Sequence, residues 1–310
     1  MDHILTLSFL ATTLGATWRL ATPIIFASVG EVISERAGVL NIGLEGTMLL
    51  GAFTGFATVY ATGNLPLGFL AAGAAGALAG LLFALFAITI KANQIIVGAA
   101  LNLLGLGLTS FLFRTYLVQT GQGVQIVPAM DVPLLSQIPY FGTPLFRQNI
   151  VVYSTILVAL GAYFLLFRTS FGLTLRAVGE HPKAVDVGGR SVALYRYAAV
   201  LIGCSLAGLG GAYLTLAHAN QFVEGMTSGR GFIALAVVVF ARWSPIGAFF
   251  VSLLFGMFYA LQLQLQAEPS IHIPYQVLQA MPYLATIVAL LLVRNRTDTP
   301  ATLGVPYRKV

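Results

Sequence analysis

A polar segment interrupts the apolar N-terminal part of this chain at residues 35–46, which read ERAGVLNIGLEG. If the flanking apolar runs are membrane helices, such groups are costly unless they face a cavity or a partner. Glycines at this position allow a helix to break and to present backbone groups to that cavity. Asn41 and Glu45 therefore predict a polar lining or structural hydrogen bonds inside a bundle. Glu35 and Arg36 fit a solvated turn as well as a functional role.

A second polar segment, residues 176–190, reads RAVGEHPKAVDVGGR. Pro182 is suited to the first position of a helix, and Gly188-Gly189 is a natural stop. The spacing predicts a helix of about two turns that projects from the membrane between basic residues. A helix this short is marginal in isolation, so it needs a partner surface. The alternative is an ordinary solvated loop.

The composition indicates that membrane-spanning helices position these two polar segments. The 310 residues are 58% hydrophobic and only 8% charged, against about 25% charged in soluble domains. These values exclude a soluble enzyme, a disordered protein and a fibrous protein. The apolar runs are long and continuous, which indicates helices rather than a membrane barrel. We therefore predict an all-α polytopic membrane protein that contacts lipid, forming one membrane domain over residues 1–310.

Charge and cysteine content set further limits. The formal net charge of +6 reflects basic residues in cytoplasmic loops and does not indicate a nucleic-acid partner. The single cysteine, Cys204, lies in an apolar run, so no disulfide or thiolate metal site is predicted. No cofactor is predicted.

The apolar stretches predict nine spans of about 20 residues. Residues 3–14 form a shorter apolar stretch, either a tenth, partial span or a helix at the membrane surface. The nine predicted spans are 17–33, 42–62, 66–90, 93–118, 149–167, 193–218, 222–240, 244–262 and 275–293.

The distribution of Lys and Arg predicts the orientation. Residues 168–196 carry five basic side chains and the C-terminal tail carries four, which places both in the cytoplasm under the positive-inside rule. Residues 119–148 then form the longest external loop. In this orientation the first four spans begin outside and the last four begin inside. That arrangement is typical of an inverted repeat, with halves at 17–118 and 193–293.

Three motifs carry a resemblance to a known family: SERAGVLNIGLEGTMLLGAF at 34–53, the segment at 176–190, and GRGFIALAVVVFARWSPIGAF at 229–249. Together they resemble the permease subunits of bacterial ABC importers for simple sugars, nucleosides and branched-chain amino acids, closest to the nucleoside branch. The resemblance covers nearly the whole chain. It implies a location in the bacterial inner membrane.

The same resemblance implies the partners. They are a separate ATPase subunit, a second permease that is commonly a different chain in the nucleoside branch, and an extracytoplasmic substrate-binding protein. Residues 168–196 resemble the family's cytoplasmic coupling segment, whose helix sits in a groove of the ATPase. His181 departs from the family pattern, where Asn is expected, so His181 itself is a doubtful contact. The residues predicted to couple to the ATPase are Arg176, Gly179, Glu180, Pro182, Lys183, Ala184 and Gly188.

Neutral amides suit a solute with hydroxyl groups or a base, because they both donate and accept hydrogen bonds. An amide in a helical bundle also often links two helices, so a structural role stays open for each residue. The residues predicted to border the solute path are Asn41, Glu45, Asn93, Gln94 and Asn102.

The sequence also bears on three other functions: the ATPase itself, an ion-coupled transporter and an intramembrane protease. The chain has no Gly-x-x-x-x-Gly-Lys-Ser/Thr loop, so it is not itself the ATPase and we predict no enzyme activity. An ion-coupled secondary transporter, with Glu45 as its membrane carboxylate, is the alternative, but it leaves residues 176–190 unexplained. Ser205 and His218 lie 13 residues apart, about 20 Å along one helix, which excludes an intramembrane serine protease.

Overall fold

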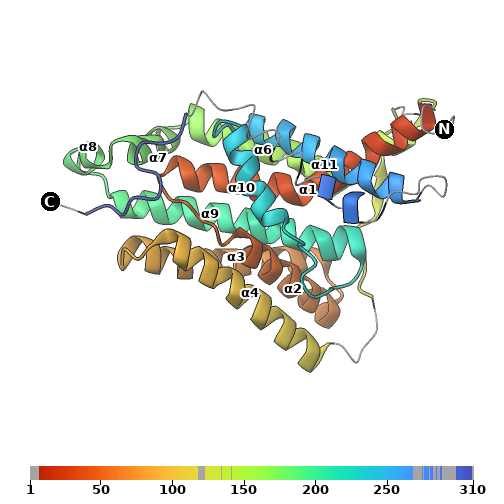
Figure 1. Ribbon diagram of the computed structural model, residues 1–310, viewed down its shortest axis with the longest axis horizontal. Coiled ribbons are helices and arrows are strands. Elements are labelled where there is room, and N and C mark those ends of the chain that lie inside the picture. Colours follow the sequence, from red (N-terminus) through yellow and green to blue (C-terminus); the bar gives the residue numbers. More distant parts are fainter. Residues whose placement is uncertain are drawn as a thin grey trace.

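The computed structural model describes residues 7–117, 123–133, 135–140, 142–267, 274, 276–278, 280–281, 284, 287 and 298–308. Most of them are helical, and the long helices run along one axis of an elongated bundle (Figure 1). The elements in order are α1 (Leu7–Arg36), α2 (Leu44–Thr62), α3 (Leu65–Ala84), the π-helix η1 (Leu85–Thr89), α4 (Gln94–Tyr116), β1 (Ala129–Asp131), the 3₁₀ helix η3 (Leu135–Gln137), α5 (Gly142–Phe146), β2 (Arg147–Asn149), α6 (Ile150–Arg168), α7 (Ser170–Glu180), α8 (Pro182–Val187), α9 (Val192–Tyr213), the π-helix η4 (Leu214–Ala219), α10 (Arg230–Phe240) and α11 (Pro245–Ala267).

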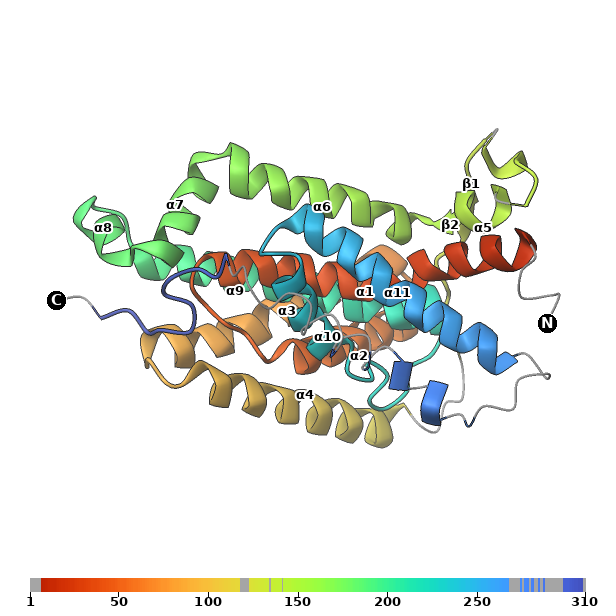
Figure 2. The ribbon, with the colours of Figure 1, turned by 45° about the horizontal axis from the view of Figure 1, so that its top comes forward.

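Two long helices, α1 and α9, form the centre of the bundle and run in opposite directions (Figures 1 and 2). They pack closely because Gly30 and Gly203 meet at the contact, where a Cβ on Gly30 would lie 2.5 Å from the Gly203 carbonyl oxygen. α11 and α10 pack on α1, whereas α3 and α2 pack on α9. α4 and α6 lie toward opposite edges of the bundle in Figure 2.

Glycines also determine how closely α2 and α3 approach α9. Gly51 of α2 faces the backbone of Gly208, and Gly76 of α3 faces the carbonyl of Cys204. A Cβ at either glycine would overlap backbone atoms of α9. Small residues take this role in membrane bundles because there is no hydrophobic force to bring helices together in lipid.

Seven of the nine predicted spans coincide with described helices, within a few residues at most ends. Residues 7–14 continue the first of them as part of α1, so within the described residues they form no separate tenth span. Five of the described helical stretches are long and apolar enough to cross a membrane, so the chain is a multi-pass helical membrane protein. They are Leu65–Thr89, Gln94–Tyr116, Ile150–Arg168, Val192–Ala219 and Pro245–Ala267.

The predicted span at 222–240 is wrong in its first half. Only α10, 11 residues long, is helical there, which is too short to cross a bilayer. Residues 220–229 form turns instead, with Gly225 at φ 67° and Gly229 at φ 80°. Glycine adopts these left-handed conformations readily, which stops a helix from starting earlier. The predicted span at 275–293 falls largely outside the described residues.

The two ends of the bundle differ in character. α7, α8 and residues 298–308 lie at one end, and the antiparallel pair β1–β2 with α5 lies at the other (Figure 2). Lys91 and Arg242 also lie at the α8 end: Lys91 lines the same cavity as Asp186 of α8, and Arg242 pairs with Asp298. The segments predicted to lie on opposite sides of the membrane are therefore at opposite ends of the molecule.

Candidate functional site

The polar segment identified in the sequence is a break between α1 and α2. Residues 37–43 are not helical, and most of them are buried. Their freed backbone amides are bound by side chains of neighbouring helices. The Asn41 amide donates to Glu31 Oε1 of α1 at 2.8 Å, and the Leu40 amide donates to Gln94 Oε1 of α4 at 2.8 Å. This is how irregular backbone is tolerated at membrane depth.

The side-chain amides of Asn41 and Asn102 form hydrogen bonds with the remaining backbone groups of the break. Asn41 Oδ1 accepts from the Gly43 amide at 2.9 Å, and its Nδ2 donates to Cys204 Sγ of α9 at 3.1 Å. Asn102 of α4 donates from Nδ2 to the Ile42 carbonyl at 3.0 Å and accepts the Gly46 amide at 2.8 Å. Both amides therefore use a donor and an acceptor to fix the segment between α4 and α9.

Glu45 binds the start of α10. Its Oε1 accepts from the Thr227 hydroxyl at 2.5 Å and from the Gly229 amide at 2.7 Å, while Oε2 accepts from the Gly231 amide at 2.7 Å. A carboxylate suits this position because the first amides of a helix lack partners and carry partial positive charge. Gly231 permits the approach, since a Cβ there would lie 2.5 Å from the Glu45 nitrogen.

The five predicted path residues thus differ in setting. Asn41 and Gln94 are buried, Glu45 and Asn102 are half-buried neighbours, and Asn93 is exposed. Asn93 accepts the Ile95 amide at 2.9 Å and so caps α4. Each of the five makes at least one hydrogen bond within the chain, and four of them are brought together around residues 40–46.

Two carboxylates of α1 support this segment, and sequence reasoning gave them too little weight. Glu31 is 0% exposed and Glu35 is 2% exposed, although Glu35 fitted a solvated turn equally well. Glu35 accepts a hydrogen bond from the indole of Trp243, and Glu31 Oε2 has no partner. Arg36 is also held, because its Nε donates to the Trp243 carbonyl at 2.9 Å. Their spacing of four residues on an apolar helix is the signal that could have indicated a shared buried face.

The second polar segment forms the predicted short helix. α8 begins at Pro182 and ends before Gly188, and Gly189 has φ 76°. Pro182 and Val185 are buried, and Val185 packs with Val178 and Val192, so α8 has a fixed base. Its outer face is exposed and includes a large apolar side chain. The exposed residues of this face are Lys183, Ala184, Val187 at 90% exposure, and Gly188.

The remaining coupling candidates face the bundle. Arg176 donates to the Leu166 carbonyl at 3.0 Å and lies over the Phe167 ring. Gly179 packs directly on the Arg36 carbonyl, where no larger residue fits. Glu180 accepts the Ala301 amide at 3.2 Å. These three residues therefore position α8 from the side that faces the bundle.

Residues 298–308, called here the C-terminal strap, bind this end together. Thr302 donates its amide to the Gly179 carbonyl at 2.9 Å, and Gly304 donates to the Gly38 carbonyl at 3.2 Å. Tyr307 donates to Asp186 of α8 at 3.0 Å. Desolvation and the neighbouring Asp186 carboxylate raise the pKa of Tyr307, so its phenol stays a donor at neutral pH. The sequence analysis predicted that this tail is basic, but it did not predict these contacts with α7 and α8.

The fold and these two regions define a multi-pass membrane protein with a buried break between two core helices and a projecting helix at one end. The chain belongs to the family described as branched-chain amino acid transport system / permease component, whose model matches residues 13–293. It is therefore a permease subunit of an ABC transporter. No solved structure matches the chain.

Three similar proteins have related names. TsgC13 of Haloferax volcanii, a putative glucose ABC transporter permease protein, is 39% identical over 321 residues, or 97% of this chain and 96% of that protein. NupC of Lactococcus lactis, a nucleoside ABC transporter permease protein, is 39% identical over 93% of this chain and 94% of its own length. NupQ of Bacillus subtilis, a guanosine ABC transporter permease protein, is 40% identical over 100% of this chain and 99% of its own length.

Proposed function

We propose that this permease imports nucleosides or simple sugars with energy from ATP hydrolysed on a separate subunit. The similar proteins named for guanosine, nucleosides and glucose support this solute class. Membership of an ABC permease family disfavours the ion-coupled alternative. Glu45, the carboxylate that this alternative needed, has both oxygens occupied by Thr227 and the α10 amides.

The observation that carries the coupling proposal is α8. A short helix with a buried base holds Ala184 and Val187 toward solvent. Together with Lys183 and Gly188 they form a projecting face of small, apolar and basic groups that the described part of the chain leaves uncovered. The ATPase subunit is the proposed partner. Lys183, Ala184 and Gly188 form the proposed contact surface, and Arg176, Gly179, Glu180 and Pro182 are the proposed supports behind it.

The proposed solute path runs beside the break at residues 37–43 and the first turn of α2. Glu45 and Asn102 are half-buried and adjacent, so they are the proposed wall of the path. Asn41 and Gln94 would hold the backbone behind this wall, and Asn93 would mark its end at the first turn of α4. A solute with hydroxyl groups would find donors and acceptors there without meeting a tight binding site.

The proposed assembly places two permeases side by side, the partner being a different chain. The outer face of α4 supports a protein or lipid contact, since Ile96, Leu103 and Phe111 are each more than 60% exposed. The end with α8 and the strap is proposed to be cytoplasmic in a bacterial inner membrane. The opposite end, with residues 123–149, would then meet an extracytoplasmic substrate-binding protein.

The proposed inverted repeat has support in the packing. If α1 corresponds to α9, α2 to α10 and α3 to α11, then the contact of α1 with α11 corresponds to that of α9 with α3. The contact of α1 with α10 likewise corresponds to that of α9 with α2. The halves at 17–118 and 193–293 are therefore kept as part of the proposal.

The experiment is solute-stimulated ATP hydrolysis by the complex reconstituted with its partner subunits. Nucleosides, sugars and amino acids would be compared as solutes. Stimulation by a nucleoside or a sugar is expected, and stimulation by amino acids alone would contradict the proposed solute class. Ala184→Trp should abolish solute-stimulated hydrolysis or ATPase retention, because one misfit at the centre of an interface costs about 2 kcal/mol or more. Ala184→Ser, which keeps the face small, is the matched control.

A further inference from the structure

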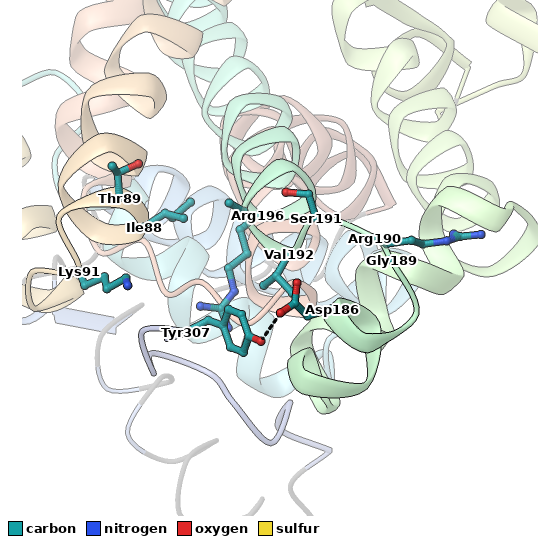
Figure 3. A pocket seen from close by; sticks show the side chains of 11 residues that line it. Ile88, Thr89, Lys91, Asp186, Gly189, Arg190, Ser191, Val192, Arg196 and Tyr307 are labelled. Carbon is teal, nitrogen blue, oxygen red and sulfur yellow. Dashed lines mark hydrogen bonds between the residues drawn. The ribbon is translucent and has the colours of Figure 1, made fainter. Parts of the chain in front are cut away.

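A cavity of about 510 Å³ that is lined in part by charged side chains opens at the α8 end of the bundle. It lies between the turn joining η1 to α4, the first turn of α9 and the C-terminal strap, as Figure 3 shows. The side chains that matter for its chemistry are Lys91, Asp186, Ser191, Arg196 and Tyr307. The described break residues 37–43 and the outer face of α8 do not line the cavity, although Arg196 lies against Gly38 at the edge of the break.

Arg196 gives this cavity a buried positive charge. The residue is 2% exposed. Its Nη1 donates to the Val305 carbonyl at 3.0 Å and its Nη2 to the Thr302 hydroxyl at 3.4 Å, whereas Nε has no partner. Both acceptors are neutral, and the ion pairs found among the described residues do not include Arg196. A buried guanidinium without a counter-ion is strongly unfavourable, which indicates that an anion completes the site.

Other groups add to the positive potential. Lys91 projects into the cavity from the side opposite α8 (Figure 3). Val192 and Ala193 bring the first turn of the 22-residue helix α9, whose amides carry partial positive charge. Arg190 contributes backbone only, because its side chain turns away to Thr174.

One acidic side chain lines the cavity among the described residues. Asp186 lies on the α8 side, where it accepts the Tyr307 hydroxyl at 3.0 Å. One carboxylate stands against two full positive charges, on Lys91 and Arg196, and the N-terminus of α9. The cavity is therefore positive overall.

We infer that this cavity binds a phosphate group, carried by an anionic phospholipid headgroup or by a soluble phosphate. A guanidinium, an ammonium and a helix N-terminus are the groups that bind phosphate in proteins. The lipid is the favoured source. An apolar groove of about 410 Å³, lined in part by Leu82, Phe86, Ile96 and Leu104, lies on the same α3–α4 hairpin that supplies Lys91. Basic pockets beside membrane helices are typical sites for anionic headgroups.

The test uses the complex purified with its partner subunits and placed in nanodiscs. One series contains phosphatidylcholine with increasing phosphatidylglycerol, and a second contains phosphatidylcholine alone with added inorganic phosphate. Bound phosphatidylglycerol is counted by native mass spectrometry, and phosphate binding is followed by ³¹P NMR. The variants are Lys91→Gln and Arg196→Lys. Arg168→Gln is the matched control, since Arg168 is an exposed basic residue at the same end but outside the cavity.

The expected result is saturable binding that Lys91→Gln weakens about fivefold, the effect of one basic residue near a lipid surface, while Arg168→Gln changes it little. Arg196→Lys keeps the positive charge but loses the unpartnered Nε donor, so it should weaken binding without abolishing it. Binding in the first series alone assigns the site to a lipid, and binding in the second assigns it to soluble phosphate. Equal losses in Lys91→Gln and Arg168→Gln would overturn the site, as would no binding of either probe. Loss of ATPase retention in Lys91→Gln with lipid and phosphate binding unchanged would also overturn it, in favour of an acidic residue of the ATPase.

Discussion

Replacing Glu45 separates a structural role for this carboxylate from a role on the solute path. In Glu45→Ala, the Gly229 and Gly231 amides and the Thr227 hydroxyl lose their acceptor. Thr227 is 0% exposed, so water cannot easily reach its hydroxyl. In Glu45→Gln the shape is kept, but one acceptor oxygen is replaced by a donor that faces another donor.

The expected losses follow from the three hydrogen bonds. A bond to a charged acceptor contributes about 1.5–3 kcal/mol. We take the low end of that range for each of the three bonds and allow for the water that reaches the half-buried Glu45. Glu45→Ala should then lower the free energy of unfolding by about 3 kcal/mol. Glu45→Gln should lose about half as much, because one side of the cap survives. The predicted order of stability is wild type, then Glu45→Gln, then Glu45→Ala.

The assay is thermal unfolding of the purified complex, measured together with solute uptake in vesicles. Glu45→Ala should lower the unfolding midpoint by roughly 5 °C or more, with uptake falling in proportion to the loss of folded complex. Glu224→Gln is the control, because it removes a carboxylate from the turn before the same helix but leaves the α10 amides capped. Glu224 pairs with Arg114 of α4 at 2.8 Å, and Arg114 is largely exposed, so a smaller loss is expected. An unchanged midpoint in Glu45→Ala together with lost uptake would refute the capping argument and place Glu45 on the solute path.

Three further predictions concern packing, topology and the path. Gly51→Ala should lower the unfolding midpoint, because its Cβ would overlap the backbone of Gly208 and overpacking costs about 1–3 kcal/mol; Gly107→Ala is the control, with nothing within 4 Å of its Cβ. Cysteines introduced at Lys183 and Gln122 should react with impermeant reagents from opposite faces, with little background because Cys204 is buried; reaction of both from one face would contradict the topology. Asn102→Ala should lower uptake while the complex still assembles, and normal uptake would show that the path lies elsewhere.

Features set by neighbouring residues in the sequence were predictable. Pro182 and Gly188-Gly189 define the start and end of α8, and the structure places both where the sequence indicated. The long apolar helices were predictable for the same reason, because hydropathy is read over one continuous stretch. α10 was mispredicted because the apolar composition of 222–240 concealed the left-handed turns at Gly225 and Gly229.

Features that depend on distant partners were not predictable. The burial of Glu35 depends on Trp243, which is 208 residues away in the chain. The role of Glu45 as a cap depends on Thr227, Gly229 and Gly231, which lie 182 to 186 residues away in the chain. The C-terminal strap binds largely through backbone groups such as the Gly304 amide, so residue types give no signal of it. Hydrogen bonds of this kind are specified by the fold as a whole and not by a local pattern.

These contacts connect the two polar segments that the sequence singled out. Gly179, just before α8, packs on the carbonyl of Arg36 at the end of α1. The strap joins the same two regions, with Thr302 bound to Gly179 and Gly304 bound to Gly38. Gly38 lies near the start of the break, and Asn41 and Asn102 bind its other end at Gly43 and Ile42. If the proposed ATPase docks on α8, its movement would reach the break through these packed backbone contacts, with no flexible side chain in between.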